Sequence, residues 1–375
     1  MAPLVQMKPE TTPAETFTEA ELAAIAALPV LRVRWQLRFT KCSLKCPYCI
    51  AEWTKRDVEF EPGRFNEIVD RLLALPYRLV LRLGVEGEIF LSPDIQEGVI
   101  RLSRHPKVEG VSFSTNMIAS DEKVAAFLDR ADCAKVGMGC TIHDTQLTDE
   151  QIEGFFRRVE MIQKRGVLVF VGYVAKPDRF EYMKRYKARL DAMGVPFLSN
   201  EYNGAFENVP YPQAYTAGER EFLREYFFAD HYFDMLVDRK SPKGKPCLAG
   251  YRYVHLGHDG RILACGTDRA LAWNVWQKIA RRLNPKWPEK IQQWRIHRRR
   301  LGNILDGDIR LSEKPRLCPH DSCTCGNEAQ AFFAVGRDYH RTRTLRVIYP
   351  KARAADLEAR YPNLGPVPND EGQHP

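Results

Sequence analysis

Residues 42–49 read Cys42-Ser-Leu-Lys-Cys46-Pro-Tyr48-Cys49 and place three cysteines within eight residues. Three thiolates can ligate three irons of a four-iron cluster, and the fourth iron is then open to a ligand that is not protein. A structural zinc ion would instead need a fourth protein ligand close by. The stretch therefore favours an iron–sulfur cluster, with a zinc knuckle or unconnected thiols as the alternatives.

The sequence around this stretch predicts alternating strands and helices. Up to about residue 200, short apolar segments alternate with helix-periodic ones, a pattern typical of βαβ units and a parallel sheet. A capping box at Thr18–Glu21 predicts a leading helix that ends near Leu28. The predicted strands lie at 31–39, 78–83, 109–114, 134–141, 167–174 and 195–199, and the predicted helices at 64–74, 94–104, 120–130, 148–165 and 178–193.

The cysteine spacing resembles the C-x3-C-x2-C motif of the radical SAM superfamily, and Tyr48 stands in the aromatic position before the last cysteine. The resemblance implies an α/β fold, a partial (β/α)6 barrel with its ligand-binding loops at the carboxyl ends of the strands. It also implies a 4Fe–4S cluster on Cys42, Cys46 and Cys49 that binds S-adenosylmethionine (SAM), with Tyr48 beside this cofactor.

A second motif follows the second predicted strand and reads Gly84-Val-Glu86-Gly87-Glu88. It resembles the Gly-Gly-Glu-Pro-like loop that holds the α-ammonium of SAM in the superfamily. It departs from that pattern because one glycine precedes Glu86 and Gly87 stands where proline is frequent. Glycine permits a close backbone approach and a carboxylate complements a cation, so Gly84, Glu86 and Gly87 are expected to bind SAM.

Later strand ends carry further candidates for binding SAM. Ser112, Ser114 and Asn116 end the third predicted strand, and strand alternation puts them on one face. Similar residues in the superfamily bond the ribose hydroxyls and the carboxylate of SAM, which implies this role for Ser114 and Asn116; a plain polar turn is the alternative. In the fifth strand, Gly172 would let adenine pack on the backbone, and Lys176 would neutralise a carboxylate.

A second group of cysteines comprises Cys247, Cys265, Cys318, Cys323 and Cys325. The spacing C-x12-G-x4-C from Cys247 to Cys265 resembles the opening of the auxiliary-cluster domains called SPASM, or twitch in the shorter form. Asp259-Gly260 predicts a hairpin turn between these two cysteines. A full SPASM domain has seven cysteines, so five imply one auxiliary 4Fe–4S cluster, with Cys323 or Cys325 as the fourth ligand. A four-thiolate zinc site is the alternative, and His320 could also ligate.

Length and composition suggest a cytoplasmic protein with metal or redox chemistry. The chain has 375 residues, ten cysteines and a net charge of +8, which does not demand nucleic acid, and it shows neither a membrane-length apolar run nor a secretory signal. The basic stretch 278–300 is interpreted as a solvated helix pair or, alternatively, as a contact for an acidic partner.

The chain is predicted to divide into five parts. These are an N-terminal extension with leading helix at 1–29, the barrel at 30–200, a connecting region at 201–246, a small cysteine-rich α+β domain at 247–335, and a partly disordered extension at 336–375.

The resemblance implies reductive cleavage of SAM to a 5′-deoxyadenosyl radical, with electrons from a flavodoxin- or ferredoxin-type donor, and hydrogen abstraction from a substrate. An auxiliary cluster would accept the electron of the substrate radical, so an oxidoreductase or epimerase is expected. Only about thirty residues precede the first strand, and they lack a winged-helix leader-recognition pattern. A small polar substrate, a sugar or an aminocyclitol, is therefore expected. The alternatives are a maturase of a ribosomal peptide or protein side chain, and an electron carrier, which would need no SAM loop.

Two residues near the end of the fourth predicted strand are catalytic candidates. Cys140 could donate hydrogen to a substrate radical, as in radical epimerases, or be a buried structural cysteine. His143 is expected to face the substrate. The other substrate-side candidates at strand ends are Asp144, Lys176, Asp178, Glu201, Tyr202 and Asn203.

Overall fold

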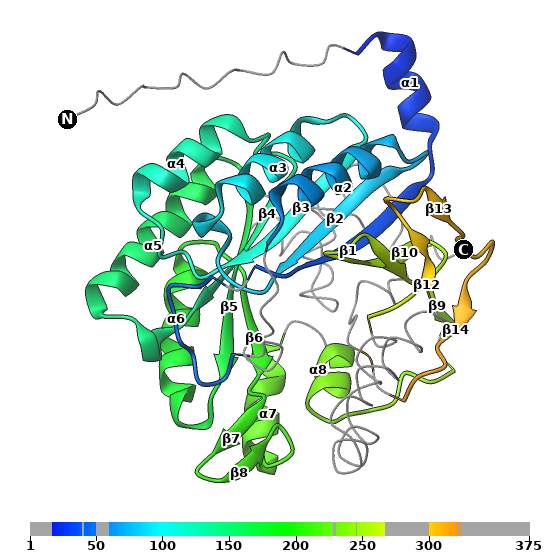
Figure 1. Ribbon diagram of the computed structural model, residues 1–375. Helices are drawn as coiled ribbons and strands as arrows, with labels where there is room; N and C mark the ends of the chain where they lie inside the picture. Colours follow the sequence, from blue (N-terminus) through cyan, green and yellow to red (C-terminus); the bar gives the residue numbers. More distant parts are fainter. Residues whose placement is uncertain are drawn as a thin grey trace.

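A parallel sheet of six consecutive strands forms the centre of the computed structural model, which describes residues 17–39, 41–49, 60–227, 230–244, 246–266, 300–321 and 323. The strands lie side by side in chain order, and helices follow them along the chain and cover one face of the sheet (Figure 1). The strands are β1 (Val30–Leu37), β2 (Arg78–Val85), β3 (Val108–Thr115), β4 (Val136–Ile142), β5 (Leu168–Ala175) and β6 (Phe197–Glu201). The helices are α2 (Pro62–Ala74), α3 (Pro93–Arg104), α4 (Asp121–Arg130), α5 (Asp149–Lys164) and α6 (Phe180–Ala192). The predicted partial-barrel fold is confirmed, and the predicted strands and helices of the barrel occur within a few residues of their predicted bounds.

Alternation along the strands gives the sheet two different faces. Trp35 of β1 stacks on Phe65 of α2 with ring centroids 4.9 Å apart, and Phe113 of β3 meets Phe127 of α4 at 5.9 Å, so these side chains point towards the helices. Their strand neighbours Gln36 and Ser114 therefore point to the opposite face. The helix-facing side buries the apolar core, and the other face is left with polar side chains and glycines near the strand ends.

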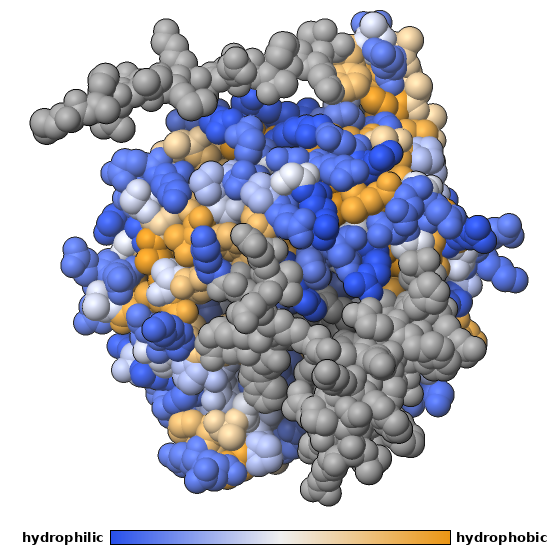
Figure 2. Space-filling view, viewed as in Figure 1, coloured by the Kyte–Doolittle hydropathy of each residue, from blue (hydrophilic) through white to orange (hydrophobic). Residues whose placement is uncertain are grey.

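Smaller elements surround this core. Helix α1 (Glu19–Ala27) has the predicted capping box at Thr18, and none of its residues is buried. Three short 3-10 helices follow strand ends: η2 (Ile89–Leu91), η3 (Asp144–Gln146) and η4 (Pro177–Arg179). After β6 come the hairpin β7 (Gly204–Phe206) and β8 (Val209–Tyr211), then α7 (Ala217–Tyr226) and α8 (Asp230–Leu236). The face in Figure 2 is largely hydrophilic, with apolar side chains gathered on α1.

The C-terminal strands extend the barrel sheet beyond β1. Strand β10 (Tyr253–Gly257) pairs parallel with β1, and β11 (Arg261–Leu263), β12 (Arg300–Asn303) and β13 (Asp308–Ile309) follow it antiparallel. The physical reason is that β1 would otherwise expose an unpaired edge of backbone amides and carbonyls. The hairpin predicted at Asp259-Gly260 is confirmed as the β10–β11 turn. Strands β9 (Pro246–Cys247) and β14 (Arg316–Leu317) pair with each other in a small sheet.

Several predictions lie outside the described residues. These are the basic stretch 278–300 up to its last residue, the C-terminal extension 336–375 and Cys325. The division of the chain at residue 247 stays a prediction. Within the described residues, no helix has the length and apolar character required to cross a membrane.

Candidate functional site: a cysteine loop at the carboxyl edge of the sheet

The cysteine loop lies against the ends of strands β3 and β4. Asn116, directly after β3, donates from Nδ2 to Cys42 Sγ at 3.6 Å. His143, directly after β4, places Nδ1 3.4 Å from Cys46 Sγ and 3.1 Å from the Tyr48 hydroxyl. Because parallel strands end at the same edge, three distant parts of the chain meet at this loop.

The electrostatics of the loop suit a bound cation. Burial raises the pKa of the Cys46 thiol to about 11; the Tyr48 hydroxyl opposes this shift, and the nearby Cys49 and Cys42 thiols add to it. Burial also lowers the pKa of His143 to about 4, so the imidazole is neutral at pH 7. Bound iron would stabilise the Cys46 thiol as a thiolate against the effect of burial. The donor set therefore fits an iron–sulfur cluster.

The spacing of the side chains bears on the zinc alternative. Across the residues that the structure describes, no three His, Cys, Asp or Glu side chains converge as ligands of one metal ion. A zinc site needs such convergence, because its ligands all bond to one ion at about 2.0–2.3 Å. A four-iron cluster holds its cysteines further apart, since each thiolate bonds to a different iron. The same finding covers the second cysteine group, and the preference for a cluster over zinc at the loop rests on its three-cysteine spacing.

Glu88 is a site residue that sequence analysis missed. Its carboxylate is buried, 2% exposed, and accepts from the Thr115 hydroxyl at 2.7 Å, the Asn116 amide at 2.7 Å and the Phe90 amide at 3.1 Å. Burial raises its pKa, and the three hydrogen bonds oppose that shift. Glu88 therefore ties the loop after β2 to the end of β3, beside the residue that contacts Cys42. The apolar Ile89 and Phe90 that follow it were the available sequence signal for burial.

Glu86, Gly84 and Gly87, which precede Glu88 in the loop after β2, have other contacts. Glu86 is half-buried, and its Oε1 accepts from Gln36 Nε2 at 3.0 Å, so its carboxylate faces the polar side of the sheet at the end of β1. Gly84 lies beside the same Gln36 side chain. Gly87 lies against the chain that enters the cysteine loop, and the Glu88 amide donates to the Lys41 carbonyl at 2.9 Å. The predicted close backbone approach at Gly87 is present, and its partner is the cysteine loop.

Gly87→Ala will displace the cysteine loop. A Cβ at this position would overlap the Phe39 and Lys41 carbonyl oxygens, and backbone atoms cannot move aside cheaply. We expect a loss of roughly 3 kcal/mol in the free energy of unfolding and a lower iron content. The matched control is Gly63→Ala in α2, where a Cβ meets nothing within 4 Å and a gain of up to about 1 kcal/mol is expected. Denaturant unfolding and iron analysis measure both effects; equal behaviour of the two variants would contradict this role of Gly87.

The remaining SAM candidates lie on the polar face or at its rim. Ser114 is exposed on β3, and Asn116 is buried, bonded to Cys42 and to Ser43 Oγ at 3.2 Å. A Cβ at Gly172 of β5 would make only ordinary contacts, with Thr141 and Asn200. Ser112 is buried and donates to the Leu81 carbonyl. These positions leave Ser114, Asn116 and Gly172 available to a ligand held next to the cysteine loop.

The two catalytic candidates have different surroundings. The Tyr48 ring stacks on His143 with centroids 6.0 Å apart and meets Tyr202 edge-on at 5.9 Å. His143 therefore lines the cysteine loop next to Tyr48. Cys140 is completely buried in the apolar core, and burial raises its pKa. This surrounding favours the structural alternative for Cys140, and its hydrogen-donor role stays a proposal.

The other strand-end candidates are mostly bonded to neighbours. Asp144 accepts from the Tyr173 hydroxyl at 2.9 Å, and Lys176 pairs with Asp178 at 2.5 Å. Glu201 accepts from Asn203 Nδ2 at 2.7 Å, and the buried Tyr202 amide donates to the Tyr215 hydroxyl at 2.9 Å. None of these contacts selects a substrate.

The second cysteine group also comes together in the structure. Cys247, Cys265 and Cys318 are each less than a tenth exposed and belong to one buried cluster, against which Cys323 packs. The β9–β14 pairing sets Cys247 opposite Arg316, two residues before Cys318, and β11 delivers Cys265. The buried His320 lies in the same segment, and its carbonyl lies 4.0 Å from Cys318 Sγ. Four thiols from distant segments thus meet in a small apolar cluster.

One family model matches part of the chain. Residues 37–179, less than half of the chain, match the model of the Radical SAM superfamily. This superfamily implies one 4Fe–4S cluster and SAM as cofactors. The matched residues include the cysteine loop, the Glu88 loop and the ends of β3 and β4.

The individual proteins that are similar to this chain match it over a short stretch or at low sequence identity. The chain is 34% identical over 103 residues to mycofactocin maturase MftC of Mycobacterium ulcerans, a match that spans 27% of each protein. Among solved structures, Streptococcus suis SuiB is 13% identical with a TM-score of 0.46, covering 68% of this chain and 64% of that one. The structure of native anSMEcpe with bound AdoMet is 14% identical with a TM-score of 0.45, covering 74% and 78%. The chain spans less than two thirds of the length of MftC and of SuiB.

Proposed function

We propose that this protein is a radical SAM enzyme that modifies a ribosomally synthesised peptide or a protein side chain. The observation that carries the catalytic part is the cysteine loop itself. Cys42, Cys46 and Cys49 lie at the carboxyl edge of the sheet, held by contacts to Gly87, Asn116 and His143. An electron carrier would have no need for a SAM loop such as the one proposed at Gly84–Glu88.

In this proposal the three cysteines hold the cluster and leave one iron for SAM. When bound, the two cofactors supply one-electron, hydrogen-abstracting chemistry. The chain orients them: Glu88 secures the loop after β2, and Asn116 and Ser114 offer an amide and a hydroxyl to a polar ligand. Tyr48, His143 and Tyr202 form an aromatic wall beside the buried Cys46, whereas Cys42 is exposed. Gly84, Glu86, Gly87 and Gly172 complete the proposed SAM site.

The second cysteine group is proposed to hold an auxiliary 4Fe–4S cluster. Burial of Cys247, Cys265 and Cys318 around one apolar cluster, with Cys323 against it, supports this assignment. The group has the donors of a four-thiolate site. Cys323 is the fourth ligand within the described residues. An auxiliary cluster would accept the electron that a substrate radical loses when it is oxidised to product, and a flavodoxin- or ferredoxin-type protein would supply electrons to the first cluster.

A maturase relative favours a peptide or protein substrate over a sugar or aminocyclitol. Mycofactocin maturase MftC carries this function in its name, and its similarity covers 103 residues of this chain. The small-substrate expectation gains no comparable support. The absence of a winged-helix pattern before β1 was its main basis in the sequence, and substrate recognition can use other surfaces.

Deuterium transfer distinguishes the two substrate classes while the substrate itself is still unidentified. Reconstituted, reduced protein is incubated with SAM and an extract of perdeuterated cells of the source organism, split by ultrafiltration into peptide and small-molecule fractions. Hydrogen abstraction would move deuterium into 5′-deoxyadenosine, which mass spectrometry detects. We expect labelled 5′-deoxyadenosine with the peptide fraction and its loss after protease treatment of that fraction.

Each outcome of this experiment selects one substrate class or none. Label from the small-molecule fraction alone would overturn the peptide assignment and restore the sugar or aminocyclitol expectation. No 5′-deoxyadenosine under any condition would contradict the radical SAM activity. Cys133→Ala serves as the matched control, because this half-buried cysteine donates to the Leu128 carbonyl, away from both cysteine groups, and should leave the label unchanged.

A further inference from the structure

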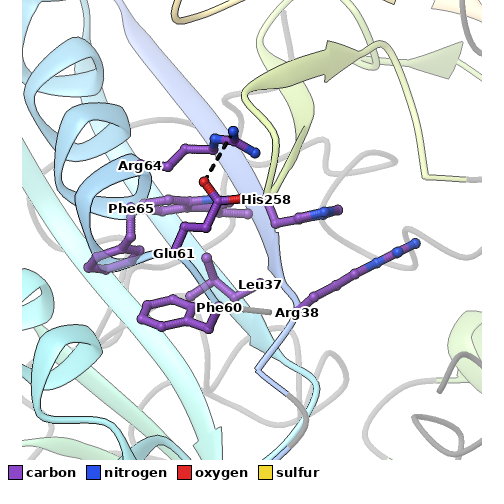
Figure 3. A pocket seen from close by; sticks show the side chains of 8 residues that line it. Leu37, Arg38, Phe60, Glu61, Arg64, Phe65 and His258 are labelled. Atoms are coloured by element: carbon purple, nitrogen blue, oxygen red, sulfur yellow. Dashed lines mark ion pairs between the residues drawn. The ribbon is translucent and has the colours of Figure 1, made fainter. Parts of the chain in front are cut away.

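A pocket lies where the end of β1 meets the start of α2 and the β10–β11 turn. It is lined by Trp35, Leu37, Arg38, Phe60, Glu61, Arg64, Phe65 and His258; Figure 3 shows Phe60, Phe65 and Glu61 on the α2 side of β1, and the Arg38 and His258 side chains extending away from them. Trp35 and Phe65 stack at 4.9 Å, and Phe60 lies 5.7 Å from Phe65, so its floor is aromatic. None of the cysteines contributes to this lining.

Two buried hydrogen-bond donors in this lining lack an acceptor among the described residues. Trp35 is 0% exposed, and its indole Nε1 has no hydrogen-bond partner there; the Nε of Arg38 is likewise buried without one. A buried donor without a partner costs free energy comparable to a lost hydrogen bond, and few native donors are left in this condition. Two such donors in one small pocket indicate that an acceptor from outside the described chain belongs there.

The charge around the pocket specifies an anionic acceptor. Arg38 makes no ion pair within the described chain, and Arg64 stands at the mouth, 3.1 Å from Glu61. Helix α2 begins at Pro62, and its N-cap Glu61 makes no side-chain cap, so the positive end of a 13-residue helix adjoins the pocket. His258 lines the opposite side. Guanidinium, helix end and indole N–H all favour a carboxylate over a neutral or cationic group.

We infer that this pocket binds the carboxylate of a small organic acid, with its apolar body against Phe60, Phe65 and the aromatic floor. Arg38 Nε and Trp35 Nε1 donate to the carboxylate oxygens, and the ligand lies outside the cysteine loop. The site is independent of the proposed radical activity. A free organic acid and the terminal carboxylate of a peptide share this chemistry.

Binding of propionate and benzoate to the full-length reconstituted protein tests the inference, by titration calorimetry and ligand-observed NMR. Propionamide and benzamide are the neutral counterparts, and N-acetylphenylalanine stands for a peptide terminus. We expect at least one acid to bind, its amide to bind at least about 10-fold more weakly, and Arg38→Gln to weaken the acid about 10-fold or more. Trp35→Phe keeps an aromatic ring but removes the indole N–H, and it should weaken binding of the acid severalfold.

The matched control is Arg71→Gln, because Arg71 lies on the same helix in an exposed pair with Glu67 outside the pocket. It should leave binding within twofold of wild type. Binding of N-acetylphenylalanine as well would identify a peptide terminus as a fitting source; binding of the simple acids alone would identify a free acid. No binding by any acid, or binding that Arg38→Gln and Arg71→Gln change equally, would overturn the inference. Neither result depends on SAM cleavage, so it leaves the proposed activity untouched.

Discussion

Replacing Cys42, Cys46 and Cys49 together with alanine should remove about four of about eight irons per chain and abolish SAM cleavage. The three thiols are the proposed ligands at the carboxyl edge of the sheet, where Asn116 contacts Cys42 and His143 contacts Cys46. Iron and sulfide analysis with EPR of the anaerobically reconstituted protein measures the first effect, and 5′-deoxyadenosine formation measures the second.

The control for this prediction is Cys133→Ala, which removes a thiol far from both groups and should keep the full iron content and SAM cleavage. Circular dichroism of each variant separates loss of the cluster from loss of the fold. Iron that stays unchanged in the triple variant would show that the loop does not hold the cluster. If the wild type holds about four irons per chain and the triple variant none, the second cysteine group binds zinc or no metal.

Replacing Cys247, Cys265 and Cys318 with alanine should remove the other four or so irons and leave the first cluster in place. SAM cleavage to 5′-deoxyadenosine should persist at a level within severalfold of wild type, while formation of the oxidised product should stop. The physical reason is the separation of the two groups: the second group packs in its own buried cluster around β9, β14 and the end of β11. Metal analysis for iron and zinc, with product analysis by mass spectrometry, measures both.

Cys323→Ala and Cys325→Ala refine this second prediction, because the sequence predicts one of these two cysteines as the fourth ligand. Cys323 packs directly against the buried cluster. We therefore expect Cys323→Ala to lower auxiliary iron and Cys325→Ala to retain it. Stoichiometric zinc in the wild-type protein, lost in these variants, would favour the four-thiolate zinc site. Loss of SAM cleavage in the triple variant with a native circular dichroism spectrum would contradict the independence of the two groups.

The fold of the barrel could be predicted from the sequence because its signals are local. The 31–39 segment alternates apolar and polar residues, and the helix at 148–165 begins with a capping box at Thr148 that the structure contains. Both patterns depend on neighbours within a few residues. The extension of the sheet by β10 could not be predicted, because parallel pairing of Val33 with Val254 joins residues far apart in the chain and leaves no local signal.

The candidate site, like the fold, was predictable from the sequence only where its signals are local. The cysteine loop was identified from spacing alone, since thiolate ligands need only the right residue types close together. Glu86 was predicted to bind SAM, and this stays a prediction. The structure adds the buried Glu88, whose burial could not be predicted because it depends on Thr115 and Asn116 from another strand. Likewise, the contact of His143 with Cys46 and Tyr48 depends on where β4 ends relative to β1.

The sequence by itself determined the parallel αβ order, the three thiols of the loop and the existence of a second cysteine group, because periodicity and spacing act over short stretches of chain. Only the tertiary structure decided which groups meet. It brought Cys247, Cys265 and Cys318 into one buried cluster, placed Gly87 against the cysteine loop, and gathered the buried donors of Trp35 and Arg38 in a pocket of their own. Such contacts depend on how distant strands are paired and packed, which no local pattern encodes.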